Sequence, residues 1–327
     1  MLNFIALQHK EKPRIAGAIE NQTASLPAYV REVAAYALST GGKRLRPMLA
    51  VLCARALGYD GDAIYPLAAT LEHFHVATLL HDDILDSADT RRAHPATHLI
   101  YGIPRTLLAA DAMVSRCFIT LAETNIPQYM GCIANAVVGT ADGEIAEIEL
   151  AGSVDGGLER YLEVIKGKTA FLLRGACEIG ALCADADQAS LQAISDFGLN
   201  LGIAFQIADD AIDFAPESVT GKPSGGDVRE GKFTPPIAFY LSSLQGRERE
   251  DFIRHFKNHD FSESELVSIV RAVNDGGYAT KAKQLSNEYL DHARNALASL
   301  PTAHEHFAKT ARSALNEALT YIQDRKA

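Results

Sequence analysis

Two short acidic segments of this chain have the spacing of a metal-binding surface. The segments are HDDILD and QIADDAID, and their aspartates are Asp82, Asp83, Asp86, Asp209, Asp210 and Asp213. On a helix, Asp82 and Asp86 lie one turn apart on the same face, and Asp209 and Asp213 repeat that arrangement. Such carboxylates repel each other unless a cation relieves the repulsion, and carboxylate oxygen with retained water is what Mg²⁺ prefers. The spacing therefore predicts two Mg²⁺-binding motifs.

A solvated acidic face or a helix cap could also contain one such motif. Two copies weaken this alternative, because we expect both to lie inside strongly apolar helices rather than at polar helix ends. A calcium-binding EF-hand does not fit, since neither segment has the loop glycine or the glutamate at the twelfth position.

Basic side chains follow a glycine turn in the segment GGKRLRP. Lys43, Arg44 and Arg46 come where a helix should begin, and a helix start offers free backbone N–H groups beside these cations. The segment therefore predicts a seat for a diphosphate. Further cations stand in or near loops and glycine-containing segments: Arg91, Arg92, Lys168, Lys222 and Lys232. Taken singly, each is better explained as a solvated or helix-terminal charge, and the sequence does not show that they converge.

The elements that must position these residues are helices. Long Ala/Leu-rich stretches, such as 66–86 and 190–214, place apolar residues three and four apart, and almost none alternate as strands do. Glycine-rich breakers separate the stretches, for example GSVDGG at 152–157. Because the sequence has no low-complexity linker and no repeat period, we expect an all-α fold and one domain over residues 1–327.

Composition restricts the function further. The net charge of −10 argues against a general affinity for nucleic acid or anionic lipid. The five scattered cysteines contain no C-x-x-C pair, which fits a reducing cytosol. The first residues lack the features of a signal peptide, and the uncharged run at 124–141 is interrupted by Pro127 and two glycines. We therefore expect a cytoplasmic protein with no transmembrane segment.

Five motifs together are similar to those of the trans-polyprenyl diphosphate synthases. They are GGKRLRP, LLHDDILD with the following RR, GKTA, FQIADDAIDF and GKPSGGDVREGKFTPP, in the order and approximate spacing of that family. The resemblance covers about residues 28–325. It implies a single large helical bundle around a central cavity, the isoprenoid synthase fold, usually assembled as a homodimer. The implied reaction is the head-to-tail condensation of isopentenyl diphosphate with an allylic prenyl diphosphate.

The resemblance also implies roles for individual residues. The six aspartates would bind Mg²⁺, with three ions per active site when substrate is bound, and Asp83 and Asp210 would bind metal or orient the other ligands. The residues expected to hold isopentenyl diphosphate without metal are Lys43, Arg46, His75 and Arg92. Those expected on the allylic diphosphate are Arg91, Lys168, Lys222 and Lys232. Thr169 and Gln206 would help to stabilise an allylic carbocation. The expected catalytic residues are therefore Asp82, Asp86, Lys168, Thr169, Gln206 and Asp209.

Product length depends on how far the growing tail extends past the side chains that precede Asp82. Ala77 and Thr78 are small, where the family's farnesyl and geranylgeranyl synthases usually have an aromatic residue. Phe74, a turn deeper, is the expected floor, and Phe118 is a weaker candidate that core packing explains better. We therefore expect an all-trans product longer than geranylgeranyl, from hexaprenyl to octaprenyl. The alternative is a shorter-chain farnesyl or geranylgeranyl diphosphate synthase.

Some positions of this sequence depart from the family pattern. Ala93 and His94 stand where glycine is usual after the arginine pair, and Glu147 stands where many members have glutamine.

A class I terpene cyclase would pair one DDxxD motif with an Asn/Ser/Glu triad and would lack GGKRLRP. A non-catalytic regulatory subunit of a heteromeric synthase would commonly lack the aspartates that are intact here. We expect an autonomous enzyme, with at most weak membrane association for product release.

Overall fold

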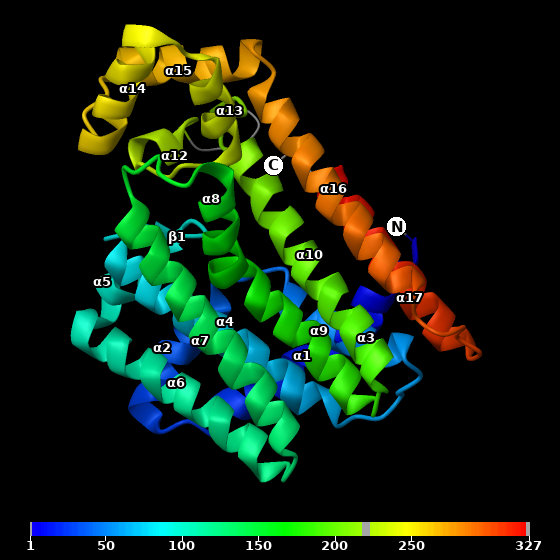
Figure 1. The fold of residues 1–327 in the computed structure, drawn as a ribbon. Coiled ribbons are helices and arrows are strands. Elements are labelled where there is room, and N and C mark those ends of the chain that lie inside the picture. The colour runs from blue at the N-terminus through cyan, green and yellow to red at the C-terminus, as the bar shows by residue number, and fades with distance from the viewer. Residues whose placement is uncertain (1, 218–222, 325–327) are drawn as a thin grey trace. The chain divides into compact units, whose positions relative to one another are not determined.

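The computed structural model describes residues 2–217 and 223–324 and is helical over most of this length (Figure 1). The elements are α1 (Leu2–Ala24), α2 (Ala28–Ser39), α3 (Leu45–Ala56), α4 (Ile64–Leu85), β1 (Thr90–Arg91), β2 (His94–Pro95), α5 (Thr97–Tyr101), α6 (Ile103–Glu123), α7 (Pro127–Leu150), α8 (Gly157–Ile165), η1 (Lys166–Ala170), α9 (Phe171–Cys183), α10 (Gln188–Ile212), α12 (Gly226–Arg229), α13 (Pro235–Ser243), α14 (Gly246–Asn258), α15 (Glu263–Asp275), α16 (Tyr278–Ala298) and α17 (His306–Gln323). The prediction of an all-α fold is confirmed. None of the described helices combines the length and hydropathy that crossing a membrane requires.

The chain forms two compact units, each built from three segments of the sequence. The first contains Met1–Val137, Gly175–Ile194 and Pro301–Leu315, and the second contains Val138–Arg174, Ser195–Leu300 and Asn316–Ala327. The acidic segment at 81–86 belongs to the first unit and the segment at 206–213 belongs to the second. The expectation of a single domain over the whole chain stays a prediction.

Helix α4 packs against α1, α3 and α6 within the first unit. Its sequence is apolar on almost every side, and a helix of that kind is stable only when it is buried. Phe74 is 1% exposed, and its ring meets the ring of Phe118 on α6 edge-on, with the centroids 5.3 Å apart. This burial fixes the helix and, with it, the direction of the side chains that leave its last turns.

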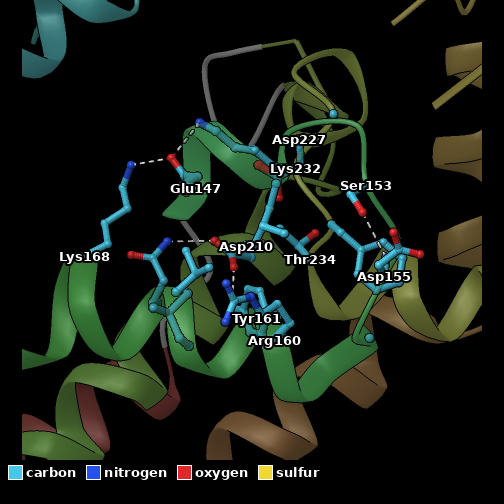
Figure 2. Close-up of a pocket in the computed structure, with 17 residues that line it drawn as sticks. Glu147, Ser153, Asp155, Arg160, Tyr161, Lys168, Asp210, Asp227, Lys232 and Thr234 are labelled. Carbon is cyan, nitrogen blue, oxygen red and sulfur yellow. Dashed lines mark hydrogen bonds and ion pairs between the residues drawn. The ribbon is translucent and has the colours of Figure 1, made fainter. Parts of the chain in front are cut away.

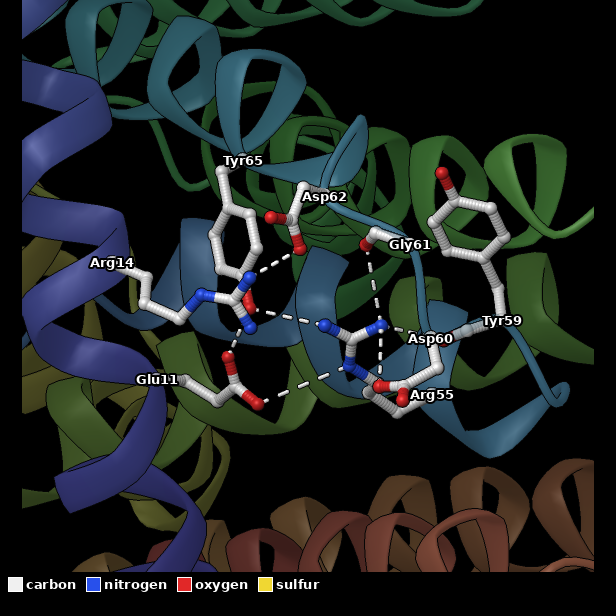
Figure 3. A network of polar contacts seen from close by, with 8 residues as sticks. All are labelled: Glu11, Arg14, Arg55, Tyr59, Asp60, Gly61, Asp62 and Tyr65. Carbon is white, nitrogen blue, oxygen red and sulfur yellow. Dashed lines mark hydrogen bonds and ion pairs between the residues drawn. The ribbon is translucent and has the colours of Figure 1, made fainter.

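A buried polar network joins α1, α3 and α4 (Figure 3). The Tyr65 hydroxyl donates a hydrogen bond of 2.5 Å to Glu11, whose other carboxylate oxygen lies 3.9 Å from Nε of Arg55. Arg55 in turn donates to the Tyr65 hydroxyl at 3.0 Å. Burial, together with the hydrogen bond to Glu11, raises the pKa of Tyr65 to about 12. Because removal of one buried charge would leave the other uncompensated, the network fixes how these three helices pack.

The chain that follows α4 forms a short antiparallel hairpin of β1 and β2, in which Arg91 pairs with His94. At its turn, Arg92 and Ala93 both have left-handed backbone conformations, with φ of 52° and 63°. Two consecutive residues of positive φ are typical of a type I′ turn, whose twist matches that of the paired strands. The arginine pair expected in a loop therefore stands on a defined hairpin.

In the second unit, α8 continues directly into a π-helical turn, η1, which contains Lys168. Such turns are rare and are frequent at functional sites. The turn packs backbone against backbone on α7. A Cβ atom added to Gly143 would lie 2.2 Å from the backbone nitrogen of Lys168, and one added to Gly167 would lie 2.6 Å from the Cα of Gly143. Glycine at these positions therefore permits the close approach that sets Lys168 against α7.

An apolar cluster anchors the end of α10 in the second unit. Its buried residues are Phe214, Val228, Ile237, Leu241, Phe252, Phe256, Leu266, Ile269 and Val273. Phe214 is fully buried and directly follows Asp213 in the chain. The second acidic segment is therefore held at a fixed end of its helix.

Replacing Gly143 by alanine should destabilise the protein. The new Cβ would overlap the backbone of η1, and overpacking of this kind costs roughly 1–3 kcal/mol. Gly131→Ala is the matched control, because Gly131 is in the same helix and nothing lies within 4 Å of its added Cβ. That variant should be neutral or stabilised by up to about 1 kcal/mol. Urea unfolding followed by circular dichroism measures both, and equal stabilities would contradict the backbone contact.

Candidate active site

Both acidic segments lie at the C-terminal ends of their helices. Asp82 is in the last turn of α4 and Asp86 follows its end, while Asp209 is in the last turn of α10 and Asp213 follows that end. The expectation that the motifs lie inside helices, away from their ends, is therefore wrong, because the chain turns off each helix within the motif. A helix C-terminus has a partial negative charge, so carboxylates there are unfavourable unless a cation is near.

The middle aspartate of the first motif is turned toward the hairpin. Asp83 is 2% exposed, and its Oδ1 accepts hydrogen bonds from Nη2 and, at 2.7 Å, from Nε of Arg91. Asp82 is partly exposed and Asp86 is exposed. The outer two carboxylates of this motif are therefore the accessible ones, while the ion pair of the middle one attaches β1 to α4.

A cluster of basic side chains, called here the cationic cluster, lies around the middle of α4 in the first unit. It consists of Arg44, Arg46, His75, Arg91 and Arg92. Burial lowers the pKa of His75 well below its usual value, and the charges of Arg46 and Arg92 lower it further. Burial likewise lowers the pKa of Arg46 to about 10, against the opposing charge of Glu72. Four of the side chains predicted to bind diphosphates are therefore brought together, with a neutral histidine among them.

One buried donor of the cluster is left without a partner among the described residues. Nε of Arg46 is buried and has no hydrogen-bond partner among the described residues. Arg92 donates to the backbone carbonyl of Gly41, and a Cβ on Gly42 would lie 2.7 Å from its guanidinium. Lys43, in the same loop, is exposed. A buried cationic donor at Arg46, beside the exposed cations of Arg92 and Lys43, fits an anion with several oxygens, such as a diphosphate.

A chain of hydrogen bonds surrounds the middle aspartate of the second motif. The Tyr161 hydroxyl donates to Oδ2 of Asp210 at 2.5 Å, and Nε2 of Gln206 donates to Oδ1 at 2.8 Å. Oε1 of Gln206 accepts from the Thr169 hydroxyl at 2.7 Å. Burial raises the pKa of Asp210 to about 7, despite these donors. The chain links η1, α8 and α10 and holds both polar groups predicted beside the carbocation, Thr169 and Gln206.

A pocket of about 120 Å³ opens above this chain in the second unit (Figure 2). Its charged lining residues are Glu147, Asp155, Arg160, Lys168, Asp210, Asp227 and Lys232. Oε2 of Glu147 lies 2.6 Å from Nζ of Lys168 and 3.9 Å from Nζ of Lys232. Two of the lysines predicted on the allylic diphosphate are therefore neighbours in one pocket. Lys222, the third, lies outside the described residues.

The donor set of the two motifs fits Mg²⁺. Within residues 2–217 and 223–324, no three His, Cys, Asp or Glu side chains could hold a metal ion as a preformed group. Each motif instead offers two outer carboxylates, from Asp82 and Asp86 and from Asp209 and Asp213. Mg²⁺ commonly binds one or two protein carboxylates and completes its shell with water and substrate phosphate. The motifs therefore suit a metal that arrives with a phosphate ligand.

The residues expected to set product length differ in exposure. Ala77 is fully buried, whereas Thr78 is partly exposed and donates from its hydroxyl to the carbonyl of His75 at 2.8 Å. The two candidate floor residues, Phe74 and Phe118, contact each other. Thr78 is therefore the accessible one of the two small residues, and the floor candidates form one aromatic pair.

Several residues of the site were not predicted from the sequence. Glu144 contributes a second carboxylate to Lys168, at 3.0 Å, and the backbone N–H of Asp227 donates to Asp213 at 3.1 Å. The spacing of Glu144 and Glu147, three apart on a helix, is the signal that could have found that pair. Tyr161 has no such local signal, because only folding brings it to Asp210.

Comparisons with known proteins identify relatives along most of the chain. A sequence model of the polyprenyl synthetase family matches residues 27–273. The octaprenyl diphosphate synthase of Escherichia coli is 33% identical over 288 residues, covering 88% of this chain and 89% of that protein. Component 2 of the heptaprenyl diphosphate synthase of Geobacillus stearothermophilus is 32% identical over 295 residues, covering 90% and 89%.

Solved structures agree with this assignment. The polyprenyl synthase of Caulobacter crescentus, crystallised with calcium and isoprenyl diphosphate, has a TM-score of 0.90 at 34% identity, covering 99% of this chain and 98% of that one. The decaprenyl diphosphate synthase of Rhodobacter capsulatus has a TM-score of 0.91 at 32% identity, with the same coverage. The resemblance noted in the sequence is confirmed: this chain belongs to the polyprenyl synthetase family of prenyltransferases, with the all-α isoprenoid synthase fold.

Proposed function

We propose that this prenyltransferase joins isopentenyl diphosphate to an allylic prenyl diphosphate, head to tail through a 1'-4 bond, with an all-trans product. The observation that carries the proposal lies on α4. There, His75 of the cationic cluster and Asp82 of the acidic motif are seven residues apart, roughly 10 Å along the helix. One helix thus supports two diphosphate seats of opposite chemistry, one made of cations and one of carboxylates that need a metal. A reaction that joins two substrates, each with its own diphosphate group, requires two such binding sites.

The outer aspartates of the motifs are the proposed metal ligands. Asp82, Asp86, Asp209 and Asp213 would hold Mg²⁺, with three ions in the substrate complex. Bound Mg²⁺ supplies Lewis-acid stabilisation of the departing diphosphate. The middle aspartates are already engaged by Arg91 and by Tyr161 with Gln206, so their proposed role is to orient the outer ligands.

Different sets of basic residues would bind the diphosphates of the two substrates. Lys43, Arg46, His75 and Arg92 would hold the diphosphate of isopentenyl diphosphate without metal, so that it stays attached while the other diphosphate leaves. The proposed contacts of the allylic diphosphate are Arg91, Lys168, Lys222 and Lys232. The oxygens of Thr169 and Gln206 would face the allylic cation and stabilise it. The alkene of isopentenyl diphosphate attacks that cation, and a proton lost to the released diphosphate completes the step.

The proposed product is hexaprenyl to octaprenyl diphosphate. Relatives of similar identity bear names from geranylgeranyl to octaprenyl diphosphate synthase, so the names leave the length open. The small, partly exposed side chain of Thr78 and the aromatic pair of Phe74 and Phe118 support a path that passes the gate and stops a turn deeper. We further propose a cytoplasmic enzyme that associates weakly with the membrane as it releases this product.

Asp82→Asn should abolish metal-dependent elongation. The amide keeps the shape of the side chain but not the charge that holds Mg²⁺, so we expect turnover to fall on the order of 10²-fold or more. Asp89→Asn, an exposed position outside the motif, is the control and should stay active. Mass spectrometry after incubation with farnesyl diphosphate, isopentenyl diphosphate and Mg²⁺, with and without EDTA, measures the products. Release of a hydrocarbon without elongation would instead indicate a cyclase, and no consumption by the wild type would indicate a regulatory subunit.

Phe74→Ala should lengthen the product, because it removes one ring of the aromatic floor. Thr78→Phe should shorten it, because a ring at the partly exposed gate would meet the tail a turn earlier. Val76→Ala, which also removes buried volume from α4, controls for general loosening and should keep the wild-type length. The chain-length distribution by mass spectrometry decides, and identical products from all four proteins would remove Phe74 and Thr78 from the path.

We also propose a homodimer in which a second copy covers the apolar face of α5 and α6. The large exposed apolar side chains of these helices are Leu99, Ile100, Ile103, Leu107 and Leu108, with Ile119 further along α6. Of these, Leu108 is 65% exposed. So many exposed apolar side chains on two consecutive helices are typical of an interaction surface.

Leu108→Glu should convert the dimer into a monomer, because it would place a charge in the apolar interface. Val267→Glu is the control, since Val267 is 66% exposed but lies on α15 in the other unit. Light scattering coupled to size exclusion measures the mass of each. A monomeric wild type would contradict the homodimer. It would favour the heteromeric assembly suggested by relatives named as component 2 of a synthase.

A further inference from the structure

We propose that Glu147 holds Lys168 and Lys232 in the substrate-free enzyme and competes with the allylic diphosphate for them. The inference deepens the proposed function, on which the diphosphate-binding role of the two lysines rests. It concerns residues of the second unit alone, all of which line or border one pocket.

The geometry places Glu147 between the two lysines (Figure 2). Its Oε2 is 2.6 Å from Nζ of Lys168 and 3.9 Å from Nζ of Lys232. Glu144 lies 3.0 Å from the first lysine, and Glu230 lies 2.6 Å from the second. Glu147 is therefore the carboxylate that the two lysines share, while its neighbours each serve one of them.

The ion pairs are partly shielded from water, which makes them stronger than surface pairs. The side chains of Glu147 and Lys168 are both 25% exposed, and that of Lys232 is 30% exposed. Burial lowers the pKa of Lys168, but the charges of Glu147 and Glu144 outweigh it and raise the pKa above its usual value. Both lysines are therefore protonated, and the carboxylates around them already balance their positive charge before any substrate enters.

A diphosphate entering this pocket meets three carboxylates around two lysines. To bind both lysines it must compete with Glu147 for their N–H donors, and it leaves that carboxylate next to its own negative charge. Like charges in a partly buried site repel strongly. Glu147 should therefore weaken binding of a metal-free diphosphate, and it should favour release of the diphosphate product by recapturing the lysines.

The first experiment measures binding of inorganic pyrophosphate in EDTA by isothermal titration calorimetry. Glu147→Gln keeps the size of the side chain and removes its charge, so we expect pyrophosphate to bind roughly fivefold to tenfold more tightly. Glu144→Gln, which frees only one lysine, should have a smaller effect. Glu149→Gln, an exposed position on the same helix, removes one charge without freeing a lysine and should bind as the wild type does.

The second experiment separates affinity from turnover. In steady-state assays with Mg²⁺, Glu147→Gln should lower the KM for farnesyl diphosphate, while kcat stays equal or falls as product release slows. Glu147→Met, which also lacks the charge, should shift pyrophosphate affinity in the same direction. Circular dichroism identifies any variant that has not folded.

Pyrophosphate affinity of Glu147→Gln and Glu147→Met equal to that of Glu149→Gln, or weaker than wild type, would overturn the inference. Failure of the proposed function gives a different result, because the wild type would then not consume isopentenyl diphosphate at all. In that case, tighter pyrophosphate binding by Glu147→Gln would still establish the competition for the lysines.

Discussion

Electrostatic repulsion at the C-terminal ends of α4 and α10 constrains the rest of this site. Each end places three aspartates where the helix itself has a partial negative charge. The protein relieves part of the repulsion internally, through Arg91 on Asp83 and through Tyr161 and Gln206 on Asp210. Asp86, the last carboxylate of the first motif, is exposed. A divalent cation would reduce the repulsion that remains, and this supports the proposed metal binding at these helix ends.

Around His75, the repulsion is between positive charges. Several guanidinium groups lie near one another, and their repulsion is reduced by Glu72, which pairs with Arg44, and by backbone carbonyls such as that of Leu38, at 2.6 Å from Arg44. Burial and the neighbouring cations keep His75 neutral. A preformed cluster of this kind binds an anion without ordering new side chains, which reduces the entropic cost of binding. The same helix therefore has an acidic motif at its C-terminal end and the cationic cluster near its middle.

Sequence spacing identified groups of residues that the structure brings close together, but it did not identify their partners. Helical period identified α4 and α10, and spacing placed the outer aspartates of each motif on one face, because both signals are local. The expected stretches 66–86 and 190–214 run only one and two residues past the ends of α4 and α10 at Leu85 and Ile212, so the motifs stand at helix ends rather than inside the helices. The contact of Tyr161 with Asp210 spans 49 residues and that of Lys168 with Glu147 spans 21, so local spacing could not reveal them. The π-helical turn also left no signal, since it depends on glycines of two different helices meeting.

The hairpin after α4 contacts both the acidic motif and the loop that precedes the cationic cluster. Arg91 pairs with Asp83 of the acidic motif. The next residue, Arg92, donates a hydrogen bond to the carbonyl of Gly41, in the loop between α2 and α3. To point consecutive arginines at these two targets, the chain adopts left-handed conformations at Arg92 and Ala93, which cost roughly 1–2 kcal/mol each for residues with a Cβ. The family pattern has glycine after the arginine pair, which would remove part of that strain. Alanine here is tolerated because the ion pair at Asp83 and the hydrogen bond at Gly41 hold the turn from both sides.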